Sequence, residues 1–170
     1  MTLTWVLKRA AILLLIVLAW ALLTAASRAA TRVPFEGYAV GTIVVKTHER
    51  RLYYVLGNGH ALRFPVGVGK VGWRWHGRAF IEGKYVNPAW RAPPEITRGG
   101  WGPVIAGGSP RNPMGVAALT LRGGEYAIHG TNNPRSIGGF VSHGCIRMYN
   151  HDIRELYSMV SVGTPVIVEQ

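Results

Sequence analysis

The only cysteine of the 170-residue chain, Cys145, lies in a segment that also carries two histidines. His143 precedes the thiol by two residues, and His129 stands sixteen residues before it, at the end of an apolar stretch. A thiol with an ordinary pKa of about 8.5 is mostly protonated at neutral pH, so a nucleophilic cysteine needs an imidazole nearby. The spacing therefore predicts a cysteine nucleophile with two candidate bases.

The four residues Ser142 to Cys145 (SHGC) contain most of what this chemistry requires. In an extended chain the histidine and the thiol share a face, and the glycine between them lets backbone amides approach a substrate oxygen. Taken singly, a cysteine or a histidine is more often an inert buried side chain than a catalyst. Three of the seven cysteine and histidine residues fall within 17 positions, however, and this concentration favours a reactive site.

Zinc offers a competing interpretation of the same residues. The cysteine and the two histidines of the segment could be ligands, with His76 or His151 as a fourth, and the protein would then be a zinc-dependent peptidase. Catalytic zinc sites also use carboxylates that orient the ligands and handle protons, and the chain has one aspartate, Asp152. The shortage of carboxylates favours cysteine chemistry, for which we expect neither a metal nor another cofactor.

The segment resembles the signature of the L,D-transpeptidase catalytic domain (YkuD-type), in which a histidine-glycine pair is followed by a loop, by Ser/Thr-His-Gly-Cys and by an arginine. This sequence supplies His129-Gly130, then SHGC at 142–145, then Arg147. The likeness also includes GGSPRNPMGVAALTL at 107–121 and GTPVIV at 163–168. Together these motifs span nearly the whole chain after residue 40.

The resemblance implies a role for each matching residue. Cys145 would be the nucleophile and His129 the base, with the backbone carbonyl of Gly130 orienting the imidazole. His143 would stand beside the thiolate and assist at the oxyanion. The residues alone leave open which of the two histidines is the base.

Three further residues are candidates for oxyanion stabilisation or substrate binding. Ser142 and Gly144 belong to the loop that carries the nucleophile, and the amide of Gly144 would assist that of Cys145 at the oxyanion. Arg147 shares the face of Cys145, and its guanidinium could hold a substrate carboxylate or brace the loop.

By the same resemblance, the substrate would be a peptidoglycan tetrapeptide stem. Cys145 would attack the carbonyl of the third residue, expel the terminal D-alanine and form a thioester, which an amine of a second stem or of an attached protein would accept. Transfer to water would make the enzyme an L,D-carboxypeptidase and needs the same residues. A non-catalytic wall-binding module is the alternative from a different class.

The elements that must position these residues are mostly strands. Runs of β-branched and aromatic residues predict strands at 42–47, 51–56, 60–68, 116–121, 125–129 and 164–168. Apolar residues at helical spacing predict one helix that Asn150 caps and Gly163 ends. The prediction is a mainly β, L,D-transpeptidase-like sandwich or barrel with one principal helix, preceded by an N-terminal hydrophobic helix.

Residues 73–113 are rich in glycine, proline and tryptophan, which indicates a binding lobe or lid over the site rather than a linker. Each tryptophan of this stretch is individually predicted to lie in the core, since a large ring gains most by burial. Just before it, GVGKVG at 67–72 matches a dinucleotide-binding pattern by letter. No helical periodicity follows, so we interpret it as a strand ending in glycine turns.

The N-terminus indicates export. Residues 10–26 form an uncharged apolar run after Lys8 and Arg9, which predicts a membrane anchor over 1–26, with a cleaved signal sequence as the alternative. We expect a linker at 27–40 and the catalytic domain at 41–170.

The net charge of +11 suits an anionic partner. Export excludes nucleic acid and leaves the membrane surface and the cell wall as partners, so we expect the domain in the cell envelope or periplasm. No obligate protein partner is evident.

Overall fold

The computed structural model describes residues 30–123 and 126–170. The strands in this part are β1 Thr31–Pro34, β2 Ile43–Lys46, β3 Arg51–Gly57, β4 His60–Pro65, β5 Val68–Gly69, β6 Gly77–Val86, β7 Trp90–Arg91, β8 Val104–Ile105, β9 Ala117–Leu121, β10 Ala127–His129, β11 Phe140–Ser142, β12 Ile146–Arg147 and β13 Pro165–Glu169. The helices are α2 Pro94–Thr97, α3 Asn150–Met159 and the 3-10 turn η1 Pro134–Ser136.

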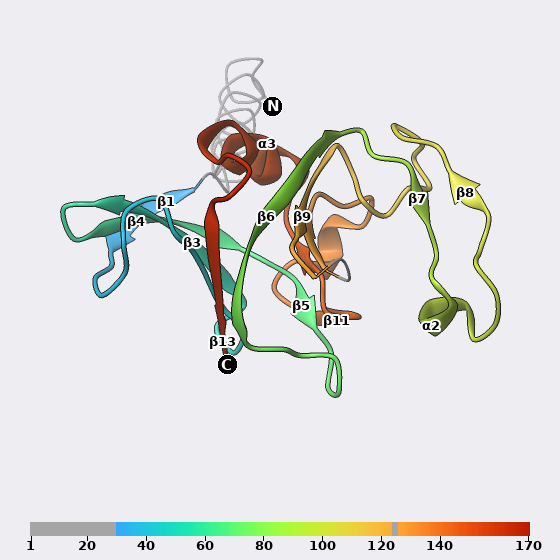
Figure 1. Cartoon of the computed structure of the whole chain (residues 1–170), viewed down its shortest axis with the longest axis horizontal. Helices are drawn as coiled ribbons and strands as arrows, with labels where there is room; N and C mark the ends of the chain where they lie inside the picture. The colour runs from blue at the N-terminus through green and yellow to red at the C-terminus, as the bar shows by residue number, and fades with distance from the viewer. Residues whose placement is uncertain (1–29, 124–125) are drawn as a thin grey trace, which may run out of the picture.

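Nine strands form one sheet in the order β1-β4-β3-β2-β13-β6-β9-β10-β12. Strands β2, β3 and β4 are antiparallel neighbours and correspond to the strands predicted at 42–47, 51–56 and 60–68. The C-terminal strand β13 runs parallel to β2 and antiparallel to β6, so it joins the two halves of the sheet (Figure 1). One hydrophobic core receives side chains from both halves, among them the fully buried Ile43, Phe64, Leu119 and Ile128. The predicted mainly β fold with one principal helix is confirmed.

Helix α3 packs against β9 and β10 and buries Ile153 and Leu156 completely. Its C-terminal carbonyls, those of Tyr157 and Val160, accept hydrogen bonds of 2.8 and 2.6 Å from Nζ of Lys84. This cation satisfies carbonyls that the helix leaves without an internal partner. The C-terminal end of the helix is therefore fixed to the sheet.

The prediction that Asn150 caps this helix is wrong. Tyr149 occupies the N-cap position without a side-chain hydrogen bond, and Asn150 is the first helical residue. Its Oδ1 accepts a hydrogen bond of 2.9 Å from the backbone amide of Thr131. The side chain therefore binds the backbone of a loop distant in sequence and does not cap its own helix.

The predicted linker at 27–40 is also wrong where the structure describes it. Strand β1 pairs antiparallel with β4, and the ring of Phe35 stacks on Tyr38 and Tyr53 at 5.1 and 4.3 Å. These aromatic contacts explain why the segment joins the sheet instead of staying free. The predicted anchor at 1–26 lies outside the described residues, and within the described part no helix has the length and apolarity needed to cross a membrane.

The stretch predicted as a lobe begins with a long strand that the sequence did not indicate. Strand β6 pairs with β13 and β9 over residues 77–86. The part that leaves the sheet is residues 87–113, called here the projecting segment, which carries β7, α2 and β8 and extends away from the body in Figure 1. The side-chain amide of Asn112 donates to the carbonyls of Pro88 and Ala106 at 2.8 and 3.1 Å and closes the base of the segment.

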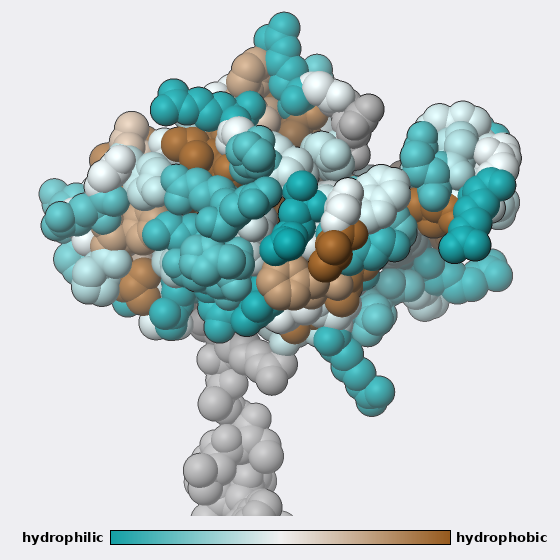
Figure 2. All heavy atoms as spheres, turned by 90° about the horizontal axis from the view of Figure 1, so that it is seen from below, coloured by the Kyte–Doolittle hydropathy of each residue, from teal (hydrophilic) through white to brown (hydrophobic). Residues whose placement is uncertain are grey.

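Figure 2 shows the face seen from below as mostly hydrophilic, with small separate groups of hydrophobic atoms. The glycine-rich stretch at 67–72 is the short strand β5 followed by a turn, as predicted, and no helix follows it. A dinucleotide site of the kind that this pattern forms requires that helix. The dinucleotide interpretation therefore has no structural support.

Candidate active site

Two neighbouring parallel strands position the candidate catalytic residues. In the pairing of β10 with β12, His129 lies opposite Arg147, and Ile128 lies opposite Ile146. Cys145 directly precedes β12, and its thiol is hydrogen-bonded to the backbone of Ala127. Side chains two residues apart on a strand share a face, so Cys145, His129 and Arg147 project to the same side. The structure thus brings together three residues that the sequence singled out.

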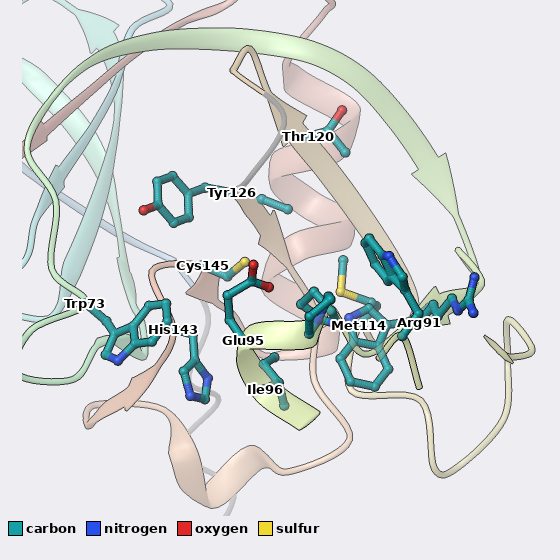
Figure 3. Close-up of a pocket in the computed structure, with 14 residues that line it drawn as sticks. Trp73, Arg91, Glu95, Ile96, Met114, Thr120, Tyr126, His143 and Cys145 are labelled. Atoms are coloured by element: carbon teal, nitrogen blue, oxygen red, sulfur yellow. The ribbon is translucent and has the colours of Figure 1, made fainter. Parts of the chain in front are cut away.

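The thiol of Cys145 lines a cavity of about 560 Å³ between the body and the projecting segment (Figure 3). Half of the lining residues come from the body: Trp73, Met114, Thr120, Tyr126, Ala127, His143 and Cys145. The other half come from the projecting segment: Trp90, Arg91, Pro93, Pro94, Glu95, Ile96 and Trp101. The prediction of a binding lobe over the site agrees with this arrangement.

Three of the four tryptophans predicted for the core line this cavity instead. Trp73 and Trp90 are half-buried, and Trp101 is 58% exposed. Trp75 packs against the core, in agreement with the prediction. The cavity is lined mainly by apolar groups, which suits a peptide or another ligand with an aliphatic part.

His129 is buried behind the cavity wall, with 4% of its surface exposed. Its Nδ1 lies 2.7 Å from the carbonyl oxygen of Gly130, and a carbonyl can only accept, so Nδ1 carries the proton and Nε2 is the basic nitrogen. Burial, and then the charge of Arg147, lower the pKa of His129 to about 4, although neighbouring backbone carbonyls oppose the shift. The ring is therefore neutral at physiological pH.

Burial raises the pKa of the Cys145 thiol above its usual value, while the hydrogen bond to Ala127 and the charge of Arg147 lower it. Desolvation is the larger effect, so the resting side chain is a protonated thiol. The Nε atom of Arg147 is buried and has no hydrogen-bond partner among the described residues. Its guanidinium is a fixed positive charge that favours the Cys145 thiolate.

The backbone of Arg147 is held by Gly67, with hydrogen bonds of 2.9 and 2.8 Å in the two directions. A side chain at Gly67 would collide with the carbonyl oxygen of Ser136, 2.7 Å from an added Cβ. The arginine side chain is not among those that line the cavity. This arrangement supports a bracing role for Arg147 over binding of a substrate carboxylate.

His143 lies at the cavity wall in a different environment from His129. Its Nε2 is 2.9 Å from Nζ of Lys70, and its ring meets Trp73 edge to face at 4.8 Å. An ammonium group only donates, so Nε2 accepts and the neutral ring carries its proton on Nδ1. Burial, Lys70 and Arg147 all lower the pKa of His143. The neutral ring of His143 therefore offers an N–H donor at Nδ1, whereas the ring of His129 offers a basic nitrogen at Nε2.

Ser142 ends β11 at the start of the loop that carries the nucleophile, and it is almost fully buried. Its Oγ donates to the carbonyl of Cys145 at 2.6 Å and accepts from the amide of Gly144 at 3.2 Å. Both hydrogen bonds stay within the loop, and Ser142 does not line the cavity. The amide of Gly144, a candidate oxyanion donor from the sequence, is thus used to hold the loop.

Gly144 has a φ of +111°, which an L side chain rarely adopts. An added Cβ would also collide with the ring of Tyr126. That ring stacks on Trp75 at 5.1 Å, and Nε1 of Trp75 donates to the Gly144 carbonyl at 3.0 Å. Two aromatic rings therefore fix the turn before the thiol, and only glycine fits between them and the loop.

Asn150 is a site residue that the sequence analysis missed. Besides its hydrogen bond to Thr131, its Oδ1 lies so close to Gly130 that a side chain there would collide with it. Asn150 thereby holds the peptide whose carbonyl orients His129. No local pattern could have shown this, because the two segments are joined only by the packing of α3 on β10.

The structure offers no cluster of metal ligands in the part that it describes. Within residues 30–123 and 126–170, no three His, Cys, Asp or Glu side chains are placed to hold a metal ion. His76, a possible fourth zinc ligand in the sequence analysis, is exposed and lies 3.3 Å from the side chain of Gln170. The zinc interpretation therefore finds no matching set of ligands in the described part of the chain.

Residues 41–168 match the family model of the YkuD L,D-transpeptidase catalytic domain. The sequence is 38% identical over 134 residues to the probable L,D-transpeptidase YbiS of Escherichia coli K12, covering 73% of this chain and 43% of that protein. It is 41% identical over 138 residues to the probable L,D-transpeptidase ErfK/SrfK of the same strain, covering 75% and 44%. The chain thus spans less than half the length of these relatives.

Solved structures show the same fold. The catalytic domain of the Enterococcus faecium L,D-transpeptidase acylated by ertapenem matches with a TM-score of 0.60 at 21% identity, covering 78% of this chain and 99% of that domain. Mycobacterium tuberculosis L,D-transpeptidase 3 in complex with a faropenem-derived adduct matches with a TM-score of 0.59 at 16% identity, covering 76% and 60%.

Proposed function

Because this chain belongs to the YkuD family of L,D-transpeptidase catalytic domains, we propose that it is a peptidoglycan L,D-transpeptidase with Cys145 as its nucleophile. The observation that carries the proposal is the thiol in the wall of a largely apolar cavity, on the same face of two paired strands as a buried neutral imidazole. A neutral base and a neutral thiol are the starting state that acyl transfer requires.

In the first step, Nε2 of His129 takes the thiol proton while Sγ of Cys145 attacks the carbonyl carbon of the third stem residue. The Gly130 carbonyl keeps the ring oriented and stabilises the imidazolium that forms. The amide bond to the terminal D-alanine then breaks, and its nitrogen takes the proton from His129. The product is a thioester on Cys145 and free D-alanine.

Negative charge develops on the sulfur and on the carbonyl oxygen during this step. The guanidinium of Arg147 favours the thiolate over the thiol. The Nδ1–H group of His143 and the backbone amide of Cys145 are the donors that we assign to the oxyanion. Lys70 contributes by keeping Nε2 of His143 unprotonated.

In the second step an amine attacks the thioester and restores the thiol. The amine belongs to a second stem or to an attached protein, and water in its place would give L,D-carboxypeptidase activity. We further propose that residues 1–26 export the domain and hold it at the membrane, with the rest in the cell envelope. The positive charge of the chain suits a carboxylate-rich polymer.

The proposal is tested with the 170-residue protein in detergent and purified tetrapeptide muropeptides. Mass spectrometry should detect cross-linked stems together with released D-alanine, and Cys145→Ala protein should give neither. D-Alanine without cross-links would identify a carboxypeptidase. A mass increase on Cys145 after incubation with ertapenem would show that the thiol is reactive. Cross-linking by Cys145→Ala protein would refute the assignment, and a wall-binding module would give neither adduct nor product.

A further inference from the structure

One carboxylate faces the nucleophile across the cavity. Glu95 is the single acidic residue among those that line the cavity, and Figure 3 shows its side chain pointing from α2 toward Cys145. We propose that Glu95 binds the ammonium group of the amine that accepts the acyl group. This inference rests on the proposed function and assigns a residue to its second step.

Glu95 has no ion-pair or hydrogen-bond partner within residues 30–123 and 126–170. Arg91, the arginine that lines the cavity together with Glu95, is occupied, because its Nε donates to the carbonyl of Gly102 at 2.8 Å and its guanidinium lies 5.4 Å from the ring centre of Trp101. Among the described residues the Glu95 carboxylate thus has no ion-pair partner. Its charge is available to a ligand.

The backbone around Glu95 is constrained, so the point from which its side chain extends is fixed relative to α2. Pro93 and Pro94 precede it and fix two φ angles. The hydroxyl of Thr97 donates to the Gly100 carbonyl at 2.6 Å and ties the end of α2 to the following turn. A preorganised backbone limits the conformational entropy that the segment loses when the side chain binds a counter-ion.

A carboxylate opposite a sulfur that must become anionic opposes catalysis unless a cation lies between them. The acyl acceptor supplies such a cation, since a primary amine is protonated at neutral pH. Trp90 and Ile96 also line the cavity, and apolar walls of this kind suit the methylene chain of an amino-acid side chain that ends in an amine. The negative charge of Glu95 and the apolar walls therefore both favour a ligand with an aliphatic chain that ends in an ammonium group.

The bound ammonium first loses one proton to solvent water and becomes a free amine. Its nitrogen bonds to the thioester carbonyl carbon, the C–S bond breaks, and the electron pair stays on Sγ of Cys145. The second proton of the nitrogen passes to His129 and then to the thiolate. Glu95 binds the acceptor and is not consumed.

The experiment compares wild-type protein with Glu95→Gln, and uses Glu82→Gln as the charge-matched control. Glu82 is exposed on β6 and does not line the cavity. The donor is a tetrapeptide stem, and two acceptors are supplied in separate arms: a wall stem with a free side-chain amine, and a lysine-containing peptide. Each acceptor is also tested with its amine acetylated. The readouts are the KM for the acceptor and the ratio of transferred to hydrolysed stem, which does not depend on the amount of thioester formed.

We expect Glu95→Gln to raise the acceptor KM about three- to tenfold and to lower the ratio of transfer to hydrolysis, as loss of a partly exposed charge pair predicts. The difference from wild type should shrink at high salt. The acceptor that wild-type protein uses more efficiently identifies the source of the amine. An unchanged KM and ratio in Glu95→Gln, or an equal change in Glu82→Gln, would overturn the inference. Absence of any thioester in wild-type protein would instead overturn the proposed function.

Discussion

Replacing Ser142 by alanine tests whether the loop beneath the nucleophile is held by this hydroxyl. The substitution removes hydrogen bonds of 2.6 and 3.2 Å and leaves the Cys145 carbonyl and the Gly144 amide without their partner in a buried place. Each buried group that loses its partner costs about 1–3 kcal/mol, so we expect a loss of about 2–3 kcal/mol in the free energy of unfolding. For a domain of this size that loss lowers Tm by about 5–10 °C.

The effect on chemistry should exceed the effect on stability. If the peptide between Gly144 and Cys145 moves, the thiol no longer keeps its position relative to His129. Misplacement of a reacting group by about 1 Å can slow a reaction up to about a hundredfold, and we expect acylation by ertapenem to slow by about ten- to a hundredfold. Thermal unfolding and the rate of adduct formation by mass spectrometry measure the two effects separately.

Ser158→Ala serves as the control, because the Ser158 hydroxyl also donates to a carbonyl, that of Glu155 at 2.7 Å, but on the exposed side of α3. It should change neither Tm nor acylation appreciably. Ser142→Thr keeps the hydroxyl and should recover most of the rate. The reasoning would be refuted if Ser142→Ala protein unfolded and acylated like the wild type.

The remaining predictions concern the neighbours of this loop. The folded pKa of His129 is about 4 and that of an unfolded histidine is about 6.5, so the unfolded chain binds more protons between these values. The contribution of His129 to the free energy of unfolding should therefore be fully present above pH 6.5 and should fall by about 3 kcal/mol as the pH drops through 4. Urea titrations should show this loss in wild-type protein and a smaller loss in His129→Gln protein. Gly144→Ala should lower both Tm and the acylation rate, because φ there is +111° and the neighbouring tyrosine ring leaves no room, whereas Gly138→Ala, at a φ of +86° in open space, should leave acylation unchanged. Lys70→Met removes the cation 2.9 Å from Nε2 of His143, so the pKa of His143 should rise toward its ordinary value in an NMR titration; an unchanged pKa would contradict the assigned pairing.

The residues around the nucleophile could be located from the sequence because the side chains that carry the chemistry are close neighbours in the chain. A thiol, an imidazole and a glycine within four positions form a recognisable unit, and the alternation of strand residues places Cys145 and Arg147 on one face. The strand pairing that brings His129 to them is not local. It depends on β10 and β12 being parallel neighbours, which the intervening loop permits but does not specify.

Strand β6 could not be predicted because its residues do not show the pattern on which strand prediction depends. Of its ten residues only Ile81 is fully buried, and Gly77 and Gly83 interrupt the alternation. The strand is stabilised by its neighbours on both sides rather than by its own side chains. Glu95 escaped notice for a similar reason, since α2 has four residues and no apolar periodicity.

The pairing of β1 with β4 limits how far the domain can stand from a membrane. If residues 1–26 lie in a bilayer, only the few residues before Thr31 remain to bridge the gap, a span of at most about 17 Å even when fully extended. A domain of this size has a radius of gyration of about 14 Å. A domain tethered in this way would stay within about one radius of gyration of the bilayer surface and could not move freely away from it.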